Sequence, residues 1–288
     1  MVTTLSEHER SELSGVASIA AGWALDQTTL EALRQAAGRS AVLHDLAVRL
    51  RRELTDQGYC LVRGAPVQSD EELAALQGLV STLSTEGNGG ALFFTISPTV
   101  DEDEPTDVSR TGASFPFHSD STYMARPHEM LGLACVVNDS EGGDSGLLLA
   151  ADIAARVESK AGRDALLALE DRVFPFFLRD PVVGHGVQLA PLLWRVGDEW
   201  HVRYRGDVLD ALMPRYAMDE RHESALAVFR SVLDNPADAE ILIRLQPNDC
   251  LMVDNRRALH SRTALGKGAR ALRRTKGYFL HSEHCTII

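Results

Sequence analysis

The chain contains 288 residues, of which 44% are hydrophobic and 24% are charged, values that are ordinary for a globular protein with a full core. Its formal net charge of −12 gives a surface that repels phosphate backbones and anionic lipid, so we expect no nucleic-acid partner. The first ten residues are polar, and the longest apolar runs are too short to cross a bilayer. We therefore expect neither a signal peptide nor a membrane partner.

The first third of the sequence predicts mainly helix. Residues 30–35 and 42–54 carry apolar side chains at three- and four-residue steps, the spacing of an amphipathic helix. Gly58 ends the second of these helices, and Tyr59–Arg63 predicts a short strand. Ser69-Asp-Glu-Glu72 predicts a capping box, which opens a helix that we expect to continue through Leu83.

From residue 91 onward the pattern changes to short apolar runs separated by turn residues. Strands are predicted at residues 92–96, 131–137, 173–178, 200–204, 241–245, 250–253 and 278–280, with helices at 164–172 and 219–233 and a loop at the acidic stretch 101–107. This order predicts an α+β fold that is mainly β, with a β-sandwich or jelly roll braced by helices. We expect a single domain, 1–288, in which 1–90 is mostly helical and 91–288 forms the jelly-roll core with helical insertions.

The cysteines, at positions 60, 135, 250 and 285, include no Cys-x-x-Cys pair. Cys60, Cys135 and Cys250 lie within apolar runs, which is typical of cysteines that act as small buried hydrophobes. The pattern predicts a reduced protein, and the cytoplasm is the expected location.

His118 and Asp120 form a predicted metal-binding pair. Residues i and i+2 of a strand point to the same side, so the imidazole and the carboxylate would meet at one point. Fe(II) accepts such nitrogen and oxygen ligands, and three protein ligands on one face leave three positions open. His260, after an apolar run and a turn, is placed to supply the third ligand. His281 and Glu283 form a rival pair, but they lie too near the C-terminus to be followed by a partner strand.

A His-x-Asp triplet alone is weak evidence in a chain with 10 histidines, because a capped loop histidine explains it equally well. The surrounding sequence is more specific: Asp254-Asn-Arg-Arg-Ala-Leu-His-Ser-Arg-Thr263 precedes Arg270-Ala-Leu-Arg-Arg274. In these segments and in residues 115–150 the chain resembles the taurine dioxygenase and clavaminate synthase-like branch of the Fe(II)/2-oxoglutarate oxygenases. The resemblance runs from Tyr59 to Tyr278 and implies a double-stranded β-helix (jelly roll) that uses Fe(II), 2-oxoglutarate and O₂.

The resemblance implies that His118, Asp120 and His260 are the iron ligands. In halogenating relatives a small residue replaces the carboxylate and frees a coordination position for chloride, so the presence of Asp120 disfavours halogenation. The resemblance therefore favours oxygenation or desaturation over halogenation.

The resemblance also implies the groups that bind 2-oxoglutarate. Arg274 would hold its far carboxylate in a two-pronged salt bridge, for which a planar guanidinium is suited, and Arg273 is the alternative if the register differs. Arg270 would lie near the keto-acid end. Ser145 stands where the family usually has a threonine that contacts the same co-substrate.

Residues for the substrate are indicated less sharply. Arg205 and Asp207 lie in a stretch that contributes to the substrate pocket in the clavaminate-like relatives, where they would bind a carboxylate and an amine; a solvated edge strand is the competing interpretation. Arg110 and Thr111 before the iron motif, and Tyr123 after it, are further substrate-binding candidates.

Together these residues predict a dioxygenase that hydroxylates a small, polar, amino-acid-like metabolite, as in natural-product biosynthesis. Desaturation or cyclisation at the same iron is one alternative, and a non-catalytic jelly-roll binding protein is another. A substrate tethered to a carrier protein remains open.

Overall fold

The computed structural model describes residues 2–85, 91–97, 111–138, 141–180, 182–216 and 218–280. Arg110, the acidic stretch 101–107, Cys285 and the pair His281 and Glu283 lie outside these ranges. Among the described residues, none of the helices combines the length and the hydropathy that a bilayer crossing requires.

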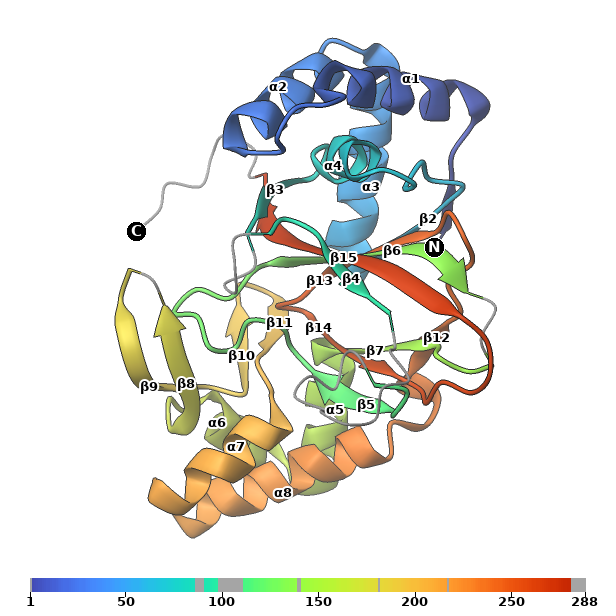
Figure 1. Ribbon diagram of the computed structural model, residues 1–288. Coiled ribbons are helices and arrows are strands. Elements are labelled where there is room, and N and C mark those ends of the chain that lie inside the picture. The colour runs from blue at the N-terminus through green and yellow to red at the C-terminus, as the bar shows by residue number, and fades with distance from the viewer. Residues whose placement is uncertain are drawn as a thin grey trace.

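Two sheets face each other at the centre of the molecule (Figure 1). The larger sheet has the order β1 (Val2–Thr4), β2 (Tyr59–Arg63), β13 (Cys250–Asp254), β6 (Met130–Asn138), β15 (Arg270–Phe279) and β3 (Ser81–Ser84), and β4 (Phe94–Ile96) also pairs with β15. The smaller sheet has the order β12 (Ile241–Ile243), β7 (Ser145–Leu149), β14 (Ala258–Arg262) and β5 (Phe115–His118). Strands β1 to β3 show that the mostly helical N-terminal part also contributes to the larger sheet.

Helices cover the outer face of each sheet (Figure 1). The larger sheet carries α1 (Glu7–Ala17), α2 (Gln27–Ala37), α3 (Ala41–Gln57) and α4 (Asp70–Gln77). The smaller sheet carries α5 (Ala150–Ala161), α6 (Arg163–Glu170), α7 (Gly206–Leu212) and α8 (Glu220–Asp234), together with the hairpins β8 (Phe174–Asp180) to β9 (Gly184–Ala190) and β10 (Leu193–Val196) to β11 (Glu199–Val202). Because both faces of β13 are covered, all five of its residues are buried.

Apolar side chains from both sheets fill the space between them. Leu131 and Leu133 of β6 and Leu251 of β13 pack in one cluster with Leu147 of β7 and Ala258 of β14. This cluster fixes the separation of the two sheets, so side chains that project inward from either sheet are held at a defined distance from the opposite one.

Several local predictions are confirmed by the structure. Helix α3 ends at Gly58, which adopts the left-handed conformation with φ 76°, a conformation that glycine accepts without a Cβ penalty. The next strand has the predicted bounds, Tyr59–Arg63. Ser69 Oγ accepts from the Glu72 amide at 3.1 Å while a Glu72 carboxylate oxygen accepts from the Ser69 amide at 3.3 Å, so the capping box is present.

The helix predicted to continue through Leu83 is wrong. Helix α4 ends at Gln77, and residues 81–84 form β3, which pairs with Lys276–Phe279 of β15. Pairing at the edge of the larger sheet outweighs the helical pattern in this segment, a tertiary preference that local spacing does not contain. The sequence pattern also missed α5 and most of β15.

The three described cysteines fulfil the prediction of buried, unpaired thiols. Cys60, Cys135 and Cys250 are buried and form no disulfide. Burial raises the pKa of the Cys135 thiol to about 11 and that of Cys250 to about 12. Such thiols stay protonated near neutral pH and are poor nucleophiles.

Gly132 in β6 is required by a close approach between the sheet and α4. A Cβ at this position would collide with the side chains of Gln77 and Thr275, which are both fully buried and hydrogen-bonded to each other. We expect Gly132→Ala to lower the free energy of unfolding by about 1–3 kcal/mol, the usual cost of overpacking, measured by urea denaturation.

Gly15 in α1 is the matched control, because an added Cβ there has no atom within 4 Å. Gly15→Ala should leave stability unchanged or raise it by up to about 1 kcal/mol, since alanine is the better helix former. Equal destabilisation by the two substitutions would contradict the packing explanation.

Candidate active site

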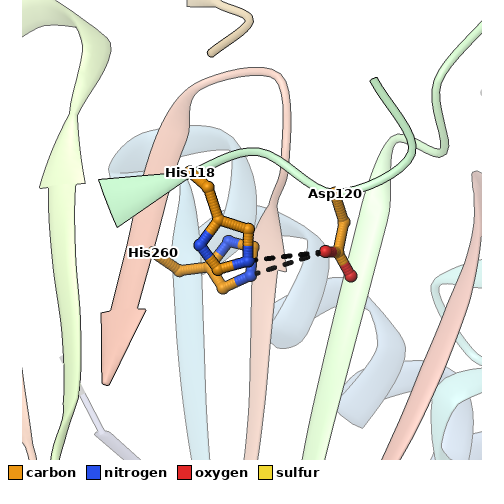
Figure 2. Close-up of side chains that lie close together, drawn as sticks. All are labelled: His118, Asp120 and His260. Atoms are coloured by element: carbon orange, nitrogen blue, oxygen red, sulfur yellow. Dashed lines mark ion pairs between the residues drawn. The ribbon is translucent and has the colours of Figure 1, made fainter. Parts of the chain in front are cut away.

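Strand pairing brings the two predicted histidine ligands together. His118 is the last residue of β5, and His260 lies directly opposite it in the antiparallel neighbour β14. Opposed residues of adjacent strands project to the same face of a sheet. The two imidazole centroids are 4.1 Å apart, and in Figure 2 one ring lies in front of the other, with the dashed lines from both leading to Asp120.

Asp120 lies in the turn that follows β5, and its Oδ1 is 3.6 Å from Nε2 of His118 and 3.9 Å from Nε2 of His260 (Figure 2). Because β5 ends at His118, the turn, and not strand alternation, directs the carboxylate toward the rings. The Asn255 side chain fixes this turn: its Oδ1 accepts from the Asp120 amide at 2.8 Å, and its Nδ2 donates to the Asp120 carbonyl at 3.0 Å.

The Asp120 carboxylate is only 5% exposed, so its charge needs compensation inside the protein. Its second oxygen, Oδ2, lies 3.2 Å from Lys276 Nζ and 3.6 Å from the Arg274 guanidinium. Burial opposes ionisation, but these two cations outweigh it and hold the pKa of Asp120 well below its usual range. The carboxylate is therefore an anion at neutral pH.

Both imidazoles direct Nε2 toward the carboxylate. His118 Nδ1 lies 2.9 Å from the Pro116 carbonyl, a contact that orients the ring. Burial and the adjacent His118 ring lower the pKa of His260 well below its usual value. Two imidazoles and a carboxylate, with ligand atoms within 4.8 Å of one another, fit the facial donor set that binds Fe(II).

A small cavity of about 50 Å³ adjoins the two histidines, between the sheets. Its lining includes Ser145 of β7 and two residues of β15, Arg270 and Arg274. Arg270 is 4% exposed, and burial, reinforced by Arg262, lowers its pKa to about 10. Arg262 also lines it, and three guanidinium groups around one cavity make a site for an anion.

A second and larger cavity, of about 470 Å³, borders Asp120. It lies between the segment 119–129, the base of the β8–β9 hairpin and the β10–β11 hairpin. The three residues are thus placed between two cavities, with His118 and His260 facing the small one and Asp120 bordering the large one.

Residues 32–276 match the family model described as taurine catabolism dioxygenase TauD, TfdA family. The chain belongs to this family. The match confirms the family that the sequence resembles and the enzyme class, dioxygenase, that its description carries.

Solved structures share the fold of this TauD, TfdA family member. An asparagine oxygenase in complex with Fe(II), 2S,3S-3-hydroxyasparagine and succinate is 19% identical, with a TM-score of 0.74 over 96% of this chain and 93% of that chain. The non-heme iron oxygenase OrfP in complex with Fe, succinate and (3S)-hydroxy-L-Arg is 16% identical, with a TM-score of 0.74 and coverage of 96% and 93%. OrfP in complex with Fe and alpha-ketoglutaric acid is 17% identical, with a TM-score of 0.71 and coverage of 96% and 94%.

In this TauD, TfdA family member, β15 places its arginines on opposite faces. Arg274 and Arg270 face the small cavity, whereas Arg273 points the other way and pairs with Asp70 of α4 at 2.9 Å. This alternation assigns Arg274, and not Arg273, to the cavity.

Four of the predicted substrate residues lie in the described part of the chain, and none of these four lines either cavity: Arg205, Asp207, Thr111 and Tyr123. Arg205 forms an ion pair with Asp207 at 2.7 Å and lies 5.2 Å from the Phe115 ring centroid. The Thr111 carbonyl accepts from Arg262, and the Tyr123 carbonyl accepts from the Arg179 amide. Their roles in substrate binding stay predictions.

Sequence reasoning missed Lys276 and Asn255. Lys276 follows Arg274 by two residues on the same strand, so the two-residue period of a strand would have placed both cations on one face. Asn255 lies within the Asp254-Asn segment that carried the resemblance, but its contact with the Asp120 turn joins residues far apart in sequence. His128 was also missed: it is 1% exposed, and its Nδ1 lies 2.7 Å from Ser121 Oγ.

His128 should make stability depend on pH. Burial, reinforced by Lys276, lowers its pKa from 6.5 to about 4, so the folded protein keeps it neutral while the unfolded chain protonates it. Stability is therefore complete above pH 6.5 and falls as the pH decreases toward 4, by about 3 kcal/mol in total. The free energy of unfolding, measured by urea denaturation across this pH range, should change less steeply with pH in His128→Gln than in the native protein.

His44→Gln, at an exposed position of α3, is the control for the loss of an imidazole. An equal change in the pH dependence of its unfolding free energy would contradict the assignment to His128.

Proposed function

We propose that the protein is an Fe(II)/2-oxoglutarate-dependent dioxygenase that hydroxylates a small, polar, amino-acid-like metabolite. The observation that carries this proposal is the juxtaposition of a buried donor set, His118, Asp120 and His260, with an arginine-lined cavity. Neither part alone specifies the chemistry. Together they supply one site for a divalent metal and, beside it, one for a dicarboxylate.

We propose also that the two facing sheets form a double-stranded β-helix (jelly roll) within a single domain, 1–288. The support is the strand order of the two sheets and the shared apolar cluster between them. In this arrangement β5, β7 and β14 of one sheet face β15 of the other. The proposed site lies between them, where a jelly roll encloses its interior.

His118, His260 and Asp120 would hold the iron on one face, leaving the opposite positions for other ligands. When bound, Fe(II) supplies the oxidising chemistry, in which O₂ and 2-oxoglutarate are converted to succinate and CO₂ as the substrate gains an oxygen atom. The contribution of the protein is position and charge. Asn255 holds the turn that carries Asp120, and Lys276 occupies its outer oxygen, which leaves Oδ1 facing the two imidazoles.

The residues that line the small cavity would bind 2-oxoglutarate, and their side chains would move apart to admit it, because about 50 Å³ is less than a five-carbon dicarboxylate occupies. Arg274 is suited to a two-pronged pairing with the far carboxylate, and the Ser145 hydroxyl can donate a further hydrogen bond. Arg270 would lie near the keto-acid end. Its Nε is buried and lacks a hydrogen-bond partner among the described residues, which is a polar group that an anionic co-substrate can satisfy.

The amino-acid-like substrate is supported by the structural neighbours. The asparagine oxygenase holds hydroxyasparagine, and OrfP holds hydroxyarginine. We extend this substrate class to the present chain. We also propose that the protein acts in the cytoplasm, the reducing location expected from its cysteines. Desaturation, cyclisation and carrier-tethered substrates involve the same metal and co-substrate. The mass of the product distinguishes the reactions: hydroxylation adds one oxygen atom, whereas desaturation or cyclisation removes two hydrogens.

The proposal is tested without a substrate by adding Fe(II) and 2-oxoglutarate under anaerobic conditions. A weak visible metal-to-ligand charge-transfer band should appear with the native protein and be absent in His118→Ala and His260→Ala, because each loses a metal ligand. His44→Ala is the control and should keep the band. A native protein that binds neither reagent would support a non-catalytic binding protein instead.

Arg274 and Arg273 provide a matched pair for the co-substrate site. Arg274→Gln should raise the 2-oxoglutarate concentration needed for half-maximal band intensity by about 10- to 100-fold, the effect of losing a charge-assisted hydrogen bond. Arg273→Gln, whose side chain faces α4, should leave that concentration nearly unchanged. The reverse ranking would place the carboxylate on the other face of β15.

A further inference from the structure

The large cavity beside Asp120 has the size and position of a substrate site. Its volume of about 470 Å³ falls in the range of small-molecule pockets. Ser119 and Asp120 form part of its wall, so a molecule within it lies next to the proposed iron ligand. Most of the remaining wall comes from the segment between β7 and β12, including Gln188, Trp194 and Arg203.

Four arginines line this cavity, but the protein itself compensates two of them. Arg126 pairs with Glu129 at 2.8 Å. Arg256 makes a two-pronged pair with Asp254, at 2.9 Å from Nε and 2.7 Å from Nη2. These two guanidinium groups are therefore held by protein carboxylates and leave little charge for a ligand.

Arg203 and Arg172 differ from this pair. Arg203 is 7% exposed, and its Nη2 donates to the main-chain carbonyls of Thr122 and Met124. Its guanidinium carbon lies 4.7 Å from the Phe176 ring centroid, and its Nε is buried with no hydrogen-bond partner among the described residues. These contacts hold the guanidinium in place, but carbonyl oxygens and a ring do not neutralise its charge.

Arg172 adds a second positive charge at the same wall. Burial lowers the pKa of Arg203 to about 10, and repulsion from Arg172 contributes. Within the described part of the chain, no carboxylate lies within ion-pair distance of either group; this includes Glu170, which also lines the cavity. Two neighbouring cations, one of them buried, favour the binding of an anion between them.

We propose that Arg172 and Arg203 bind a negatively charged side-chain group of the substrate in this cavity. This group is additional to the α-carboxylate that every amino acid carries, so the substrate is an acidic amino acid or a close analogue. This inference rests on the proposed function, because it assumes that the molecule in the large cavity is the one oxidised at the neighbouring metal. It narrows the substrate from amino-acid-like compounds in general to those that carry an additional carboxylate or an equivalent anion.

The test uses the protein loaded anaerobically with Fe(II) and 2-oxoglutarate. L-Glutamate, L-glutamine, L-aspartate and L-asparagine are titrated separately, and binding is followed by the change in the charge-transfer band. At least one acid should bind about tenfold or more tightly than its amide, the effect of one charge-assisted hydrogen bond. Arg172→Glu should abolish this preference. Arg179→Glu, at another exposed arginine, in β8, that does not line the cavity, should retain it.

A second measurement locates the anion without any variant. Phenylglyoxal modifies accessible arginines, and peptide mass mapping gives the rate at each position. The acid that binds should slow modification at Arg172 but not at Arg179, and its amide should slow neither. Equal binding of acid and amide, no binding by any of the four, or an unprotected Arg172 would overturn the inference while the band keeps the proposed function intact. Absence of the band itself would reject both.

Discussion

The negative charge of Asp120, removed from water, is the constraint around which the centre of this molecule is arranged. A buried carboxylate is tolerated only when cations or hydrogen-bond donors surround it. The smaller sheet and its following turn supply the carboxylate and the two imidazoles, and β15 of the larger sheet supplies Arg274 and Lys276. The ion pairs of Asp120 with Arg274 and Lys276 therefore join the two sheets by electrostatic attraction, in addition to the apolar packing between them. Binding of a divalent cation would place a positive charge among three donor groups whose ligand atoms lie within 4.8 Å of one another.

Local sequence signals predicted those parts of the fold that depend on one or two neighbouring residues. Gly58 predicted the end of α3 because glycine, which lacks a Cβ, adopts the left-handed conformation found there without strain. The capping box at Ser69 predicted the start of α4. The end of that helix was predicted wrongly, because residues 81–84 acquire their strand partner from β15, at residues 276–279, about two thirds of the chain length away. Pairings of this kind have no signature in a short window of sequence.

The same distinction explains what could be predicted of the site. The His118-x-Asp120 spacing and the resemblance around His260 identified three groups that the structure brings together. The resemblance also identified Ser145, Arg270 and Arg274, which share one cavity. The predicted substrate residues Arg205 and Asp207 pair with each other, whereas Arg172 and Arg203 line the large cavity. Their proximity depends on how the hairpins pack, and neither residue is distinguished from other arginines by its sequence context.

The two cavities are built by different parts of the chain. The small one is lined by strands of the central sheets, including β5, β7, β14 and β15, while half of the residues that line the large one come from the segment between β7 and β12. Substitutions in that segment can therefore accumulate without displacing the inner groups, provided that they spare contacts such as the two hydrogen bonds between Tyr204 and Ser119. During evolution the sequence of the segment between β7 and β12 can then change faster than that of the strands around the small cavity. This is one route by which chains of the same fold reach sequence identities as low as 16%. For engineering, the segment 150–240 is the part to exchange when a different specificity is sought.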